Sequence, residues 1–113
     1  MGESLAGLFV LETLLREPTL FDHYVAFDPS LWWDRGVLVD SARAGLAMPG
    51  TKRRTLFVAQ SRDDRDDVTA RLGALLRTAR PVGLRWTHVS RPELTHATVF
   101  RAMKPTALVD ALR

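Results

Sequence analysis

The sequence predicts an α/β fold built on a short parallel sheet of about three strands. Two apolar runs, residues 24–27 and 55–60, have the length and the bounded ends of buried strands, and residues 84–89 alternate in the manner of a strand. Helical patterns separate these runs, and strands that are joined through helices pair in parallel. Ligands of such a sheet bind beyond the carboxyl ends of its strands, so the residues that follow each strand are the first candidates for a site.

The first stretch of the chain carries the most specific motif. Residues 2–7, Gly-Glu-Ser-Leu-Ala-Gly, fit the nucleophile-elbow pattern, in which a serine sits on a sharp turn between a strand and a helix. Gly2 and Ala6 flank Ser4 where larger side chains would collide, and Gly7 lets the following helix pack closely. A strand should lead into the elbow, yet only three residues precede Ser4. A motif this short also arises by chance, so a serine that merely caps a helix is the alternative.

Helices account for most of the remaining chain. Leucines line one face of the first helix, Pro18 ends it, and the last helix is expected to be interrupted or bent at Pro105. The second helix is weak and is closed by Pro49-Gly50. The predicted helices span residues 5–16, 37–48, 68–79 and 99–112.

Composition excludes several classes of protein. The 113 residues make one domain at most, and the absence of cysteine rules out disulfides and thiolate metal sites. The histidines show no metal-ligand spacing, so we expect no metal and no cofactor. The net charge is +3, but arginines alternate with acidic residues over 62–67, and the only compact basic cluster, residues 52–54, precedes an apolar strand. We therefore expect no nucleic-acid partner, and no apolar run is long enough for a membrane span.

A serine, an acid and a histidine follow successive strands in the order used by α/β-hydrolase triads. Ser4 lies at the elbow, Asp63 and Asp64 follow the middle strand, and His96 follows the last strand. A serine hydroxyl becomes a nucleophile when a neutral imidazole accepts its proton, and a carboxylate holds that imidazole in the right tautomer. His96 is the preferred general base, because His88 and His23 fall inside or just before strands.

The identity of the acid is less certain than that of the serine. Asp63 is preferred narrowly over Asp64, since both lie close to the end of the middle strand. Asp66 and Asp67 are better placed to cap the following helix. A Ser–His dyad without a carboxylate partner is the third alternative.

Three stretches resemble an esterase group of bacterial α/β-hydrolases that includes esterase D-like enzymes and siderophore esterases: residues 2–9, 27–33 and 94–100. The resemblance implies a three-layer α/β/α, partial α/β-hydrolase fold that starts at the elbow. It also implies a carboxylic-ester hydrolase that forms an acyl-enzyme on Ser4, with His96 as base and a small-molecule ester as substrate.

The same resemblance assigns residues around the reacting pair. The backbone N–H of Leu5, the residue after the nucleophile, would donate to the oxyanion. Residues 28–33 would border the substrate pocket, with Trp32 and Trp33 as contacts. Large aromatic side chains that simply fill the gap beneath a loop are the alternative for this pair.

Members of this group carry an N-terminal half with the first strands and a loop that donates a second oxyanion N–H. We therefore expect residues 1–113 to be a single segment, the C-terminal half of a hydrolase domain, with little activity alone. An open apolar sheet edge would favour self-association. The alternative function is a non-catalytic α/β binding or interaction module that needs a partner to complete its sheet.

Overall fold

The computed structural model describes residues 1–47 and 52–113, which form a parallel sheet of four strands. The strands are β1 (Gly2–Glu3), β2 (His23–Phe27), β3 (Arg54–Ser61) and β4 (Leu84–Arg91), in the spatial order β1-β2-β3-β4. The three expected strands are present, and the count of about three is corrected by β1. This two-residue strand pairs Gly2 with Ala26 and Glu3 with Phe27. A strand therefore does lead into the elbow.

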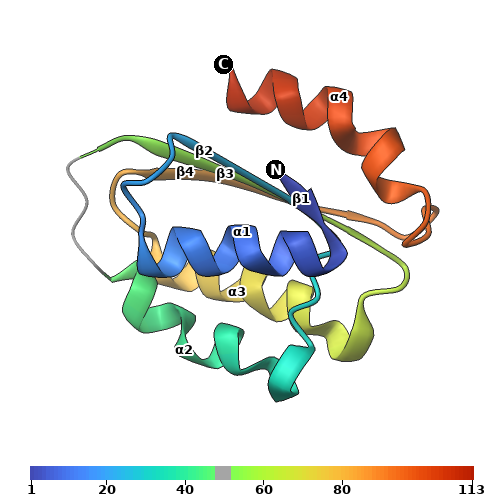
Figure 1. The fold of residues 1–113 in the computed structure, drawn as a ribbon, viewed down its shortest axis with the longest axis horizontal. Helices are drawn as coiled ribbons and strands as arrows, with labels where there is room; N and C mark the ends of the chain where they lie inside the picture. The colour runs from blue at the N-terminus through green and yellow to red at the C-terminus, as the bar shows by residue number, and fades with distance from the viewer. Residues whose placement is uncertain (48–51) are drawn as a thin grey trace.

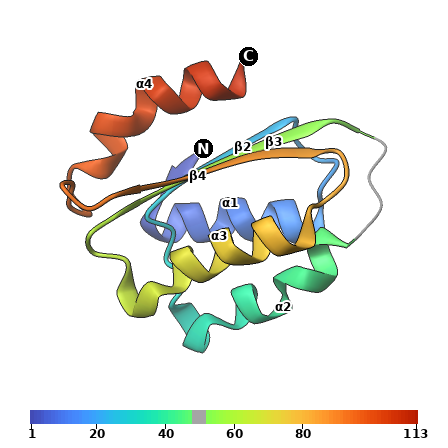
Figure 2. The ribbon, with the colours of Figure 1, turned by 180° about the vertical axis from the view of Figure 1, so that it is seen from behind.

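Helices cover both faces of the sheet. α1 (Ser4–Arg16) and α3 (Val68–Ala79) lie on one face with α2 (Val37–Leu46) outside them, and α4 (Val99–Ala111) covers the other face (Figure 1, Figure 2). Short 3₁₀ turns precede α2 and α3, at Trp33–Gly36 and Arg65–Asp67. This is the expected three-layer α/β/α arrangement. The expected end of the second helix, at Met48 and Pro49-Gly50, lies outside the described residues.

α4 continues through Pro105 without the expected interruption. Proline lacks an N–H, so the helix loses the hydrogen bond to the carbonyl of Arg101, four residues earlier. Both residues are exposed. Water can therefore satisfy the carbonyl that proline leaves without a donor, and the helix continues.

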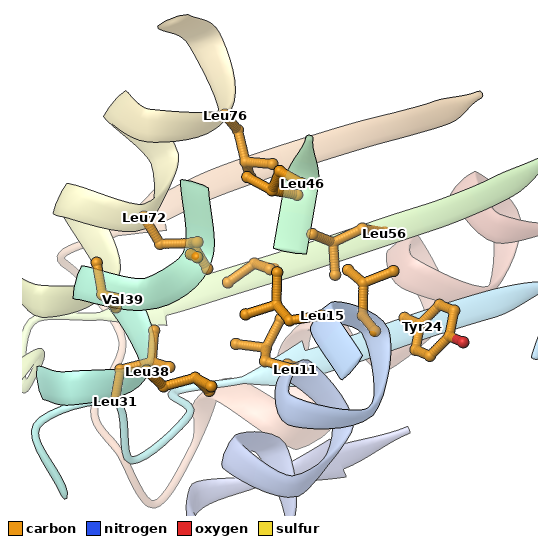
Figure 3. Packing of buried hydrophobic residues seen from close by; sticks show 14 of the residues in the cluster. Leu11, Leu15, Tyr24, Leu31, Leu38, Val39, Leu46, Leu56, Leu72 and Leu76 are labelled. Atoms are coloured by element: carbon orange, nitrogen blue, oxygen red, sulfur yellow. The ribbon is translucent and has the colours of Figure 1, made fainter. Parts of the chain in front are cut away.

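Two hydrophobic clusters hold the three layers together. The larger cluster lies between the sheet and α1, α2 and α3, and Leu56 of β3, Leu11 of α1, Leu46 of α2 and Leu72 of α3 contribute to it (Figure 3). The smaller cluster lies under α4, where Val99, Met103 and Ala107 recur every four residues and pack with Phe27 and Phe57. Because both faces are covered, β2 and β3 read as continuous apolar runs rather than alternating ones.

All four carboxyl ends lie at one edge of the sheet, because every strand pair is parallel. Ser4, Asp28 and the residues after Ser61 and Arg91 therefore emerge at the same edge. Within the described ranges, no helix is both long enough and apolar enough to cross a bilayer.

Candidate active site

Ser4 sits on a sharp turn between β1 and α1. Its φ is +57°, in the left-handed region that side chains rarely adopt. A Cβ on Gly2 would lie 2.7 Å from the carbonyl carbon of Ala6, and a Cβ on Gly7 would lie 3.1 Å from the Cα of Pro29. Gly2 is therefore needed where the turn closes, and Gly7 allows the tight approach of α1 to the residues after β2.

His96 lies in the loop between β4 and α4 and contacts Ser4 through its ring. His96 Nε2 is 3.2 Å from Ser4 Oγ, although the two residues are 92 positions apart in the chain. On the far side of the ring, Nδ1 is 3.0 Å from Asp28 Oδ2. The imidazole therefore lies between a hydroxyl and a carboxylate.

Asp28 is the first residue after β2 and its side chain is 4 % exposed. Its Oδ1 accepts the backbone N–H of Ser61 at 2.6 Å, and its Oδ2 accepts the hydroxyl of Ser61 as well as the N–H of His96 Nδ1. Since a carboxylate cannot donate, Nδ1 carries the proton and Nε2 is free to accept one from Ser4. Three donated hydrogen bonds compensate the burial of this carboxylate.

The acid beside the ring is therefore Asp28, and the expectation that Asp63 or Asp64 contacts Nδ1 is corrected. Asp63 Oδ2 instead accepts the backbone N–H of His96 at 2.8 Å. Asp64 accepts the N–H groups of Thr69 and Ala70, at 3.1 and 3.2 Å. The physical reason is that β3 extends to Ser61, so the turn that follows lies beside the His96 loop rather than beneath its ring.

Asp64, rather than Asp66 or Asp67, thus caps α3. The latter two are exposed and have positive φ values of 57° and 54°. Neither residue makes a side-chain hydrogen bond to the start of α3.

The other two histidines lie away from Ser4, as the sequence predicts. His88 Nε2 is hydrogen-bonded to Gln60 Oε1, and its ring fills the space that a side chain at residue 73 would need. Burial is the main cause that lowers the pKa of His88, and repulsion from Arg77 adds to it. His23 Nδ1 lies 2.8 Å from Thr55 Oγ1 at the surface. Within residues 1–47 and 52–113, no three acidic or histidine side chains gather as a metal site would require.

Ser30, which the sequence indicates only as one of residues 28–33, is a neighbour of the elbow. Its hydroxyl is 3.4 Å from Ser4 Oγ, and its backbone N–H donates to the Ser4 carbonyl at 3.0 Å. Ser61, which holds Asp28, was missed. Position was the signal available in the sequence, because Ser61 is the last residue of β3 and Ser30 follows the end of β2 by three residues.

Leu5 and the two tryptophans are the other residues that the resemblance assigns to the site. Leu5 is the second residue of α1, whose first turn has backbone N–H groups without intrahelical partners. Trp32 lines a hollow of about 20 Å³ together with Asp28 and His96, and the Arg65 guanidinium lies 4.2 Å from its ring centre. Trp33 is 56 % exposed, with its ring centre 6.1 Å from that of Trp32.

The hollow at Trp32 is too small for a substrate, but a larger one flanks the site. Its volume is about 570 Å³. Glu3 lines it directly before Ser4 in the chain, and Ala97 lines it directly after His96. The rest of its wall comes from the first turns of α4, at Thr98, Phe100, Arg101 and Ala102.

Known proteins similar to this chain are siderophore esterases. A stretch of 42 residues is 43 % identical to a siderophore enterobactin esterase of Emericella nidulans, and a stretch of 34 residues is 50 % identical to the ferri-bacillibactin esterase BesA of Bacillus subtilis. The chain is homologous to siderophore esterases of the α/β-hydrolase type. These matches cover 37 % and 30 % of this chain but only 14 % and 12 % of the two curated proteins. No family model matches the chain.

Solved structures share the fold over almost the whole chain. The BES protein from Bacillus cereus superposes with a TM-score of 0.80 at 19 % identity, covering 95 % of this chain and 42 % of its own. An IroE-like serine hydrolase from Shewanella oneidensis gives 0.78 at 25 % identity, covering 97 % of this chain and 37 % of its own. This chain therefore spans less than half the length of these two neighbours.

Proposed function

We propose that this chain supplies the nucleophile, base and acid of a serine ester hydrolase. The carrying observation is the unbroken hydrogen-bonded series from Ser4 through His96 to Asp28, with distances of 3.2 and 3.0 Å. In this mechanism His96 Nε2 takes the proton of Ser4 as its Oγ attacks the ester carbonyl carbon. Asp28 keeps the ring in the correct tautomer and stabilises the imidazolium that forms.

The same groups complete the formation of the acyl-enzyme and then hydrolyse it. His96 returns its proton to the leaving alkoxide, the ester C–O bond breaks, and the acyl group stays on Ser4. Water then enters, His96 takes one of its protons, and the hydroxide equivalent attacks the acyl carbon. The bond between that carbon and Ser4 Oγ breaks, His96 returns the proton to Ser4 Oγ, and the acid is released. The backbone N–H of Leu5 donates to the oxyanion in both steps.

The relatives support a proposal for the substrate class. Enterobactin and bacillibactin esterases are among the proteins that this chain resembles, so we propose a siderophore-type ester as substrate. We assign to this substrate surface contacts with the ring of Trp32, which lies beside Asp28 and His96, and with the adjacent ring of Trp33. The side chain of Arg65 over Trp32 would favour an anionic aromatic group there.

We expect turnover by residues 1–113 alone to be slow. Leu5 is the one oxyanion donor that we identify among the described residues, and loss of a single donor lowers turnover by about 10²–10³. Reaction with a phosphonate probe demands less, because the probe requires only an activated serine and access to it.

A fluorophosphonate probe tests the proposal directly. The unchanged chain should become labelled on Ser4, which peptide mass spectrometry locates, while Ser4→Ala abolishes labelling and His96→Ala reduces it at least about 10³-fold. Ser41→Ala is the matched control, since Ser41 lies on α2, where its hydroxyl donates to the Leu38 carbonyl. If the folded chain does not react, or if Ser4→Ala reacts as fast as the unchanged chain, the hydrolase proposal fails. The binding-module alternative, which the unpaired outer edge of β1 favours, would then take its place.

A further inference from the structure

Asp63 lies beside the site, yet the mechanism above does not use it. Its Oδ2 accepts the backbone N–H of His96 at 2.8 Å, and its own N–H donates to Ser61 Oγ at 3.0 Å. Ser61 in turn donates both its N–H and its hydroxyl to Asp28. One turn after β3 therefore holds the backbone of His96 and also the carboxylate that the His96 ring contacts.

The loop that carries His96 needs such support. The His96 side chain is 49 % exposed, and its position depends on where the loop between β4 and α4 places its Cα. Arg62 donates its N–H to the Leu94 carbonyl at 3.1 Å, two residues before His96. The hydrogen bond that the backbone N–H of His96 donates to Asp63 holds the backbone of His96 itself. Misplacement of a reacting group by about 1 Å can cost about 10²-fold in rate.

We propose that Asp63 is a positioning residue for His96, acting on its backbone N–H and not on its imidazole. The consequence for reactivity rests on the proposed function, whereas the contact does not. An oxygen acceptor is all that this role requires. Asparagine, which keeps that oxygen and removes the charge, should therefore replace Asp63, whereas alanine should not.

Two variants separate this role from that of a triad acid. Asp63→Ala should lower the rate of fluorophosphonate labelling by roughly 10- to 100-fold, and Asp63→Asn should restore it almost fully. A triad acid behaves differently, because its asparagine variant also loses about 10⁴-fold. Glu93→Ala is the matched control, because Glu93 lies in the same loop as His96 and its carboxylate pairs with Arg91. Equal losses in Asp63→Asn and Asp63→Ala would overturn the proposal.

Proton magnetic resonance gives a readout that does not depend on the labelling. The Nδ1 proton that His96 donates to Asp28 should persist in the unchanged chain and in Asp63→Asn, and exchange faster with water in Asp63→Ala. Circular dichroism establishes that each variant is folded. If this pattern appears while the unchanged chain resists the probe, the hydrolase proposal fails and the positioning role stands. If Asp63→Ala keeps the proton lifetime of the unchanged chain, the positioning role is overturned.

Discussion

Asp28 is a carboxylate that is almost fully removed from water at the end of β2. Asp28→Asn keeps the shape of the side chain but cannot stabilise an imidazolium, and its amide can place an N–H against Nδ1. We expect the labelling rate of Ser4 to fall by roughly 10³- to 10⁴-fold, the scale seen when a triad acid becomes an amide. The measurement is the rate constant of fluorophosphonate reaction, with thermal unfolding as the check on folding.

The control for this prediction is Asp22→Asn. Asp22 pairs with Lys52 just before the amino end of β2, at the opposite end of this strand from Asp28. Its loss should leave the rate unchanged. An Asp28→Asn variant that reacts at the unchanged rate would instead favour a Ser–His dyad.

The contact between Ser4 and His96 was predictable from sequence, and the identity of the carboxylate beside the His96 ring was not, for a physical reason. The elbow motif constrains the backbone itself, since Gly2 and Gly7 sit where a Cβ would collide. A carboxylate near a strand end carries no such constraint. Asp28 and Asp63 both emerge at the same sheet edge, and only the turn after Ser61 decides which of them lies against the imidazole.

At the scale of elements, α3 and β4 are joined through one histidine. His88 on β4 packs against Gly73 of α3, and its ring bonds to Gln60, whose amide donates to Asp64 at 3.3 Å. Asp64 caps α3. The network therefore links β3, β4 and the start of α3, and burial of the His88 ring favours its neutral form.

This network should make stability depend on pH. The folded state lowers the pKa of His88 below its usual 6.5, so the unfolded chain takes up the proton first as the pH falls. His88 thus contributes stability that is complete above about pH 6.5 and is lost below it. Between pH 7.5 and 5.5 the contribution falls by no more than about 1.4 kcal/mol, the value for one pH unit below 6.5.

Urea unfolding of the unchanged chain and of His88→Gln at the two pH values measures this effect. The two chains share every other titrating group, so the difference between their pH dependences isolates His88. Arg77 lowers the pKa of His88 and Asp64 raises it, and both residues remain in the variant. A larger loss of stability at low pH in His88→Gln than in the unchanged chain would contradict the prediction.

Most element bounds were predictable because burial on both faces gives strands a continuous apolar pattern. α3 spans the expected residues 68–79, and β3 and β4 extend the predicted runs by one or two residues at an end. β1 could not be predicted from its own residues. Two residues carry no periodicity, and the pairing of Gly2 with Ala26 is a property of the assembled sheet.

At the scale of the whole molecule, the outer edge of β1 and the adjoining face of α1 are apolar. Leu5 and Phe9 are 61 % and 69 % exposed, and Met1 is 51 % exposed. A hollow of about 250 Å³ lies between α1 and β2, lined by Phe9, Tyr24 and their neighbours. Apolar residues beside an unpaired strand edge favour association.

We therefore predict that residues 1–113 self-associate as their concentration rises. Light scattering coupled to size-exclusion chromatography, at low and high loading, measures the mass. Phe9→Glu should shift the chain toward the monomer, because a charge cannot be buried unpaired in such a contact. Val82→Glu adds the same charge in the loop between α3 and β4, at a residue that is 80 % exposed, and it should leave the measured mass unchanged. A chain that stays monomeric at every loading would contradict the prediction.

β1 and β4 form opposite edges of the sheet, with two strands between them, which separates their axes by roughly 14 Å. The loop after β4 must therefore return across the ends of β3 and β2 before its histidine can meet Ser4. α4 begins three residues after His96 and packs on Phe27 of β2 and Phe57 of β3, so the docking of α4 carries the loop back across the sheet. Any form of the chain in which α4 is undocked leaves the Ser4 hydroxyl an ordinary alcohol, and chemical reactivity therefore reports on the docking of the last helix.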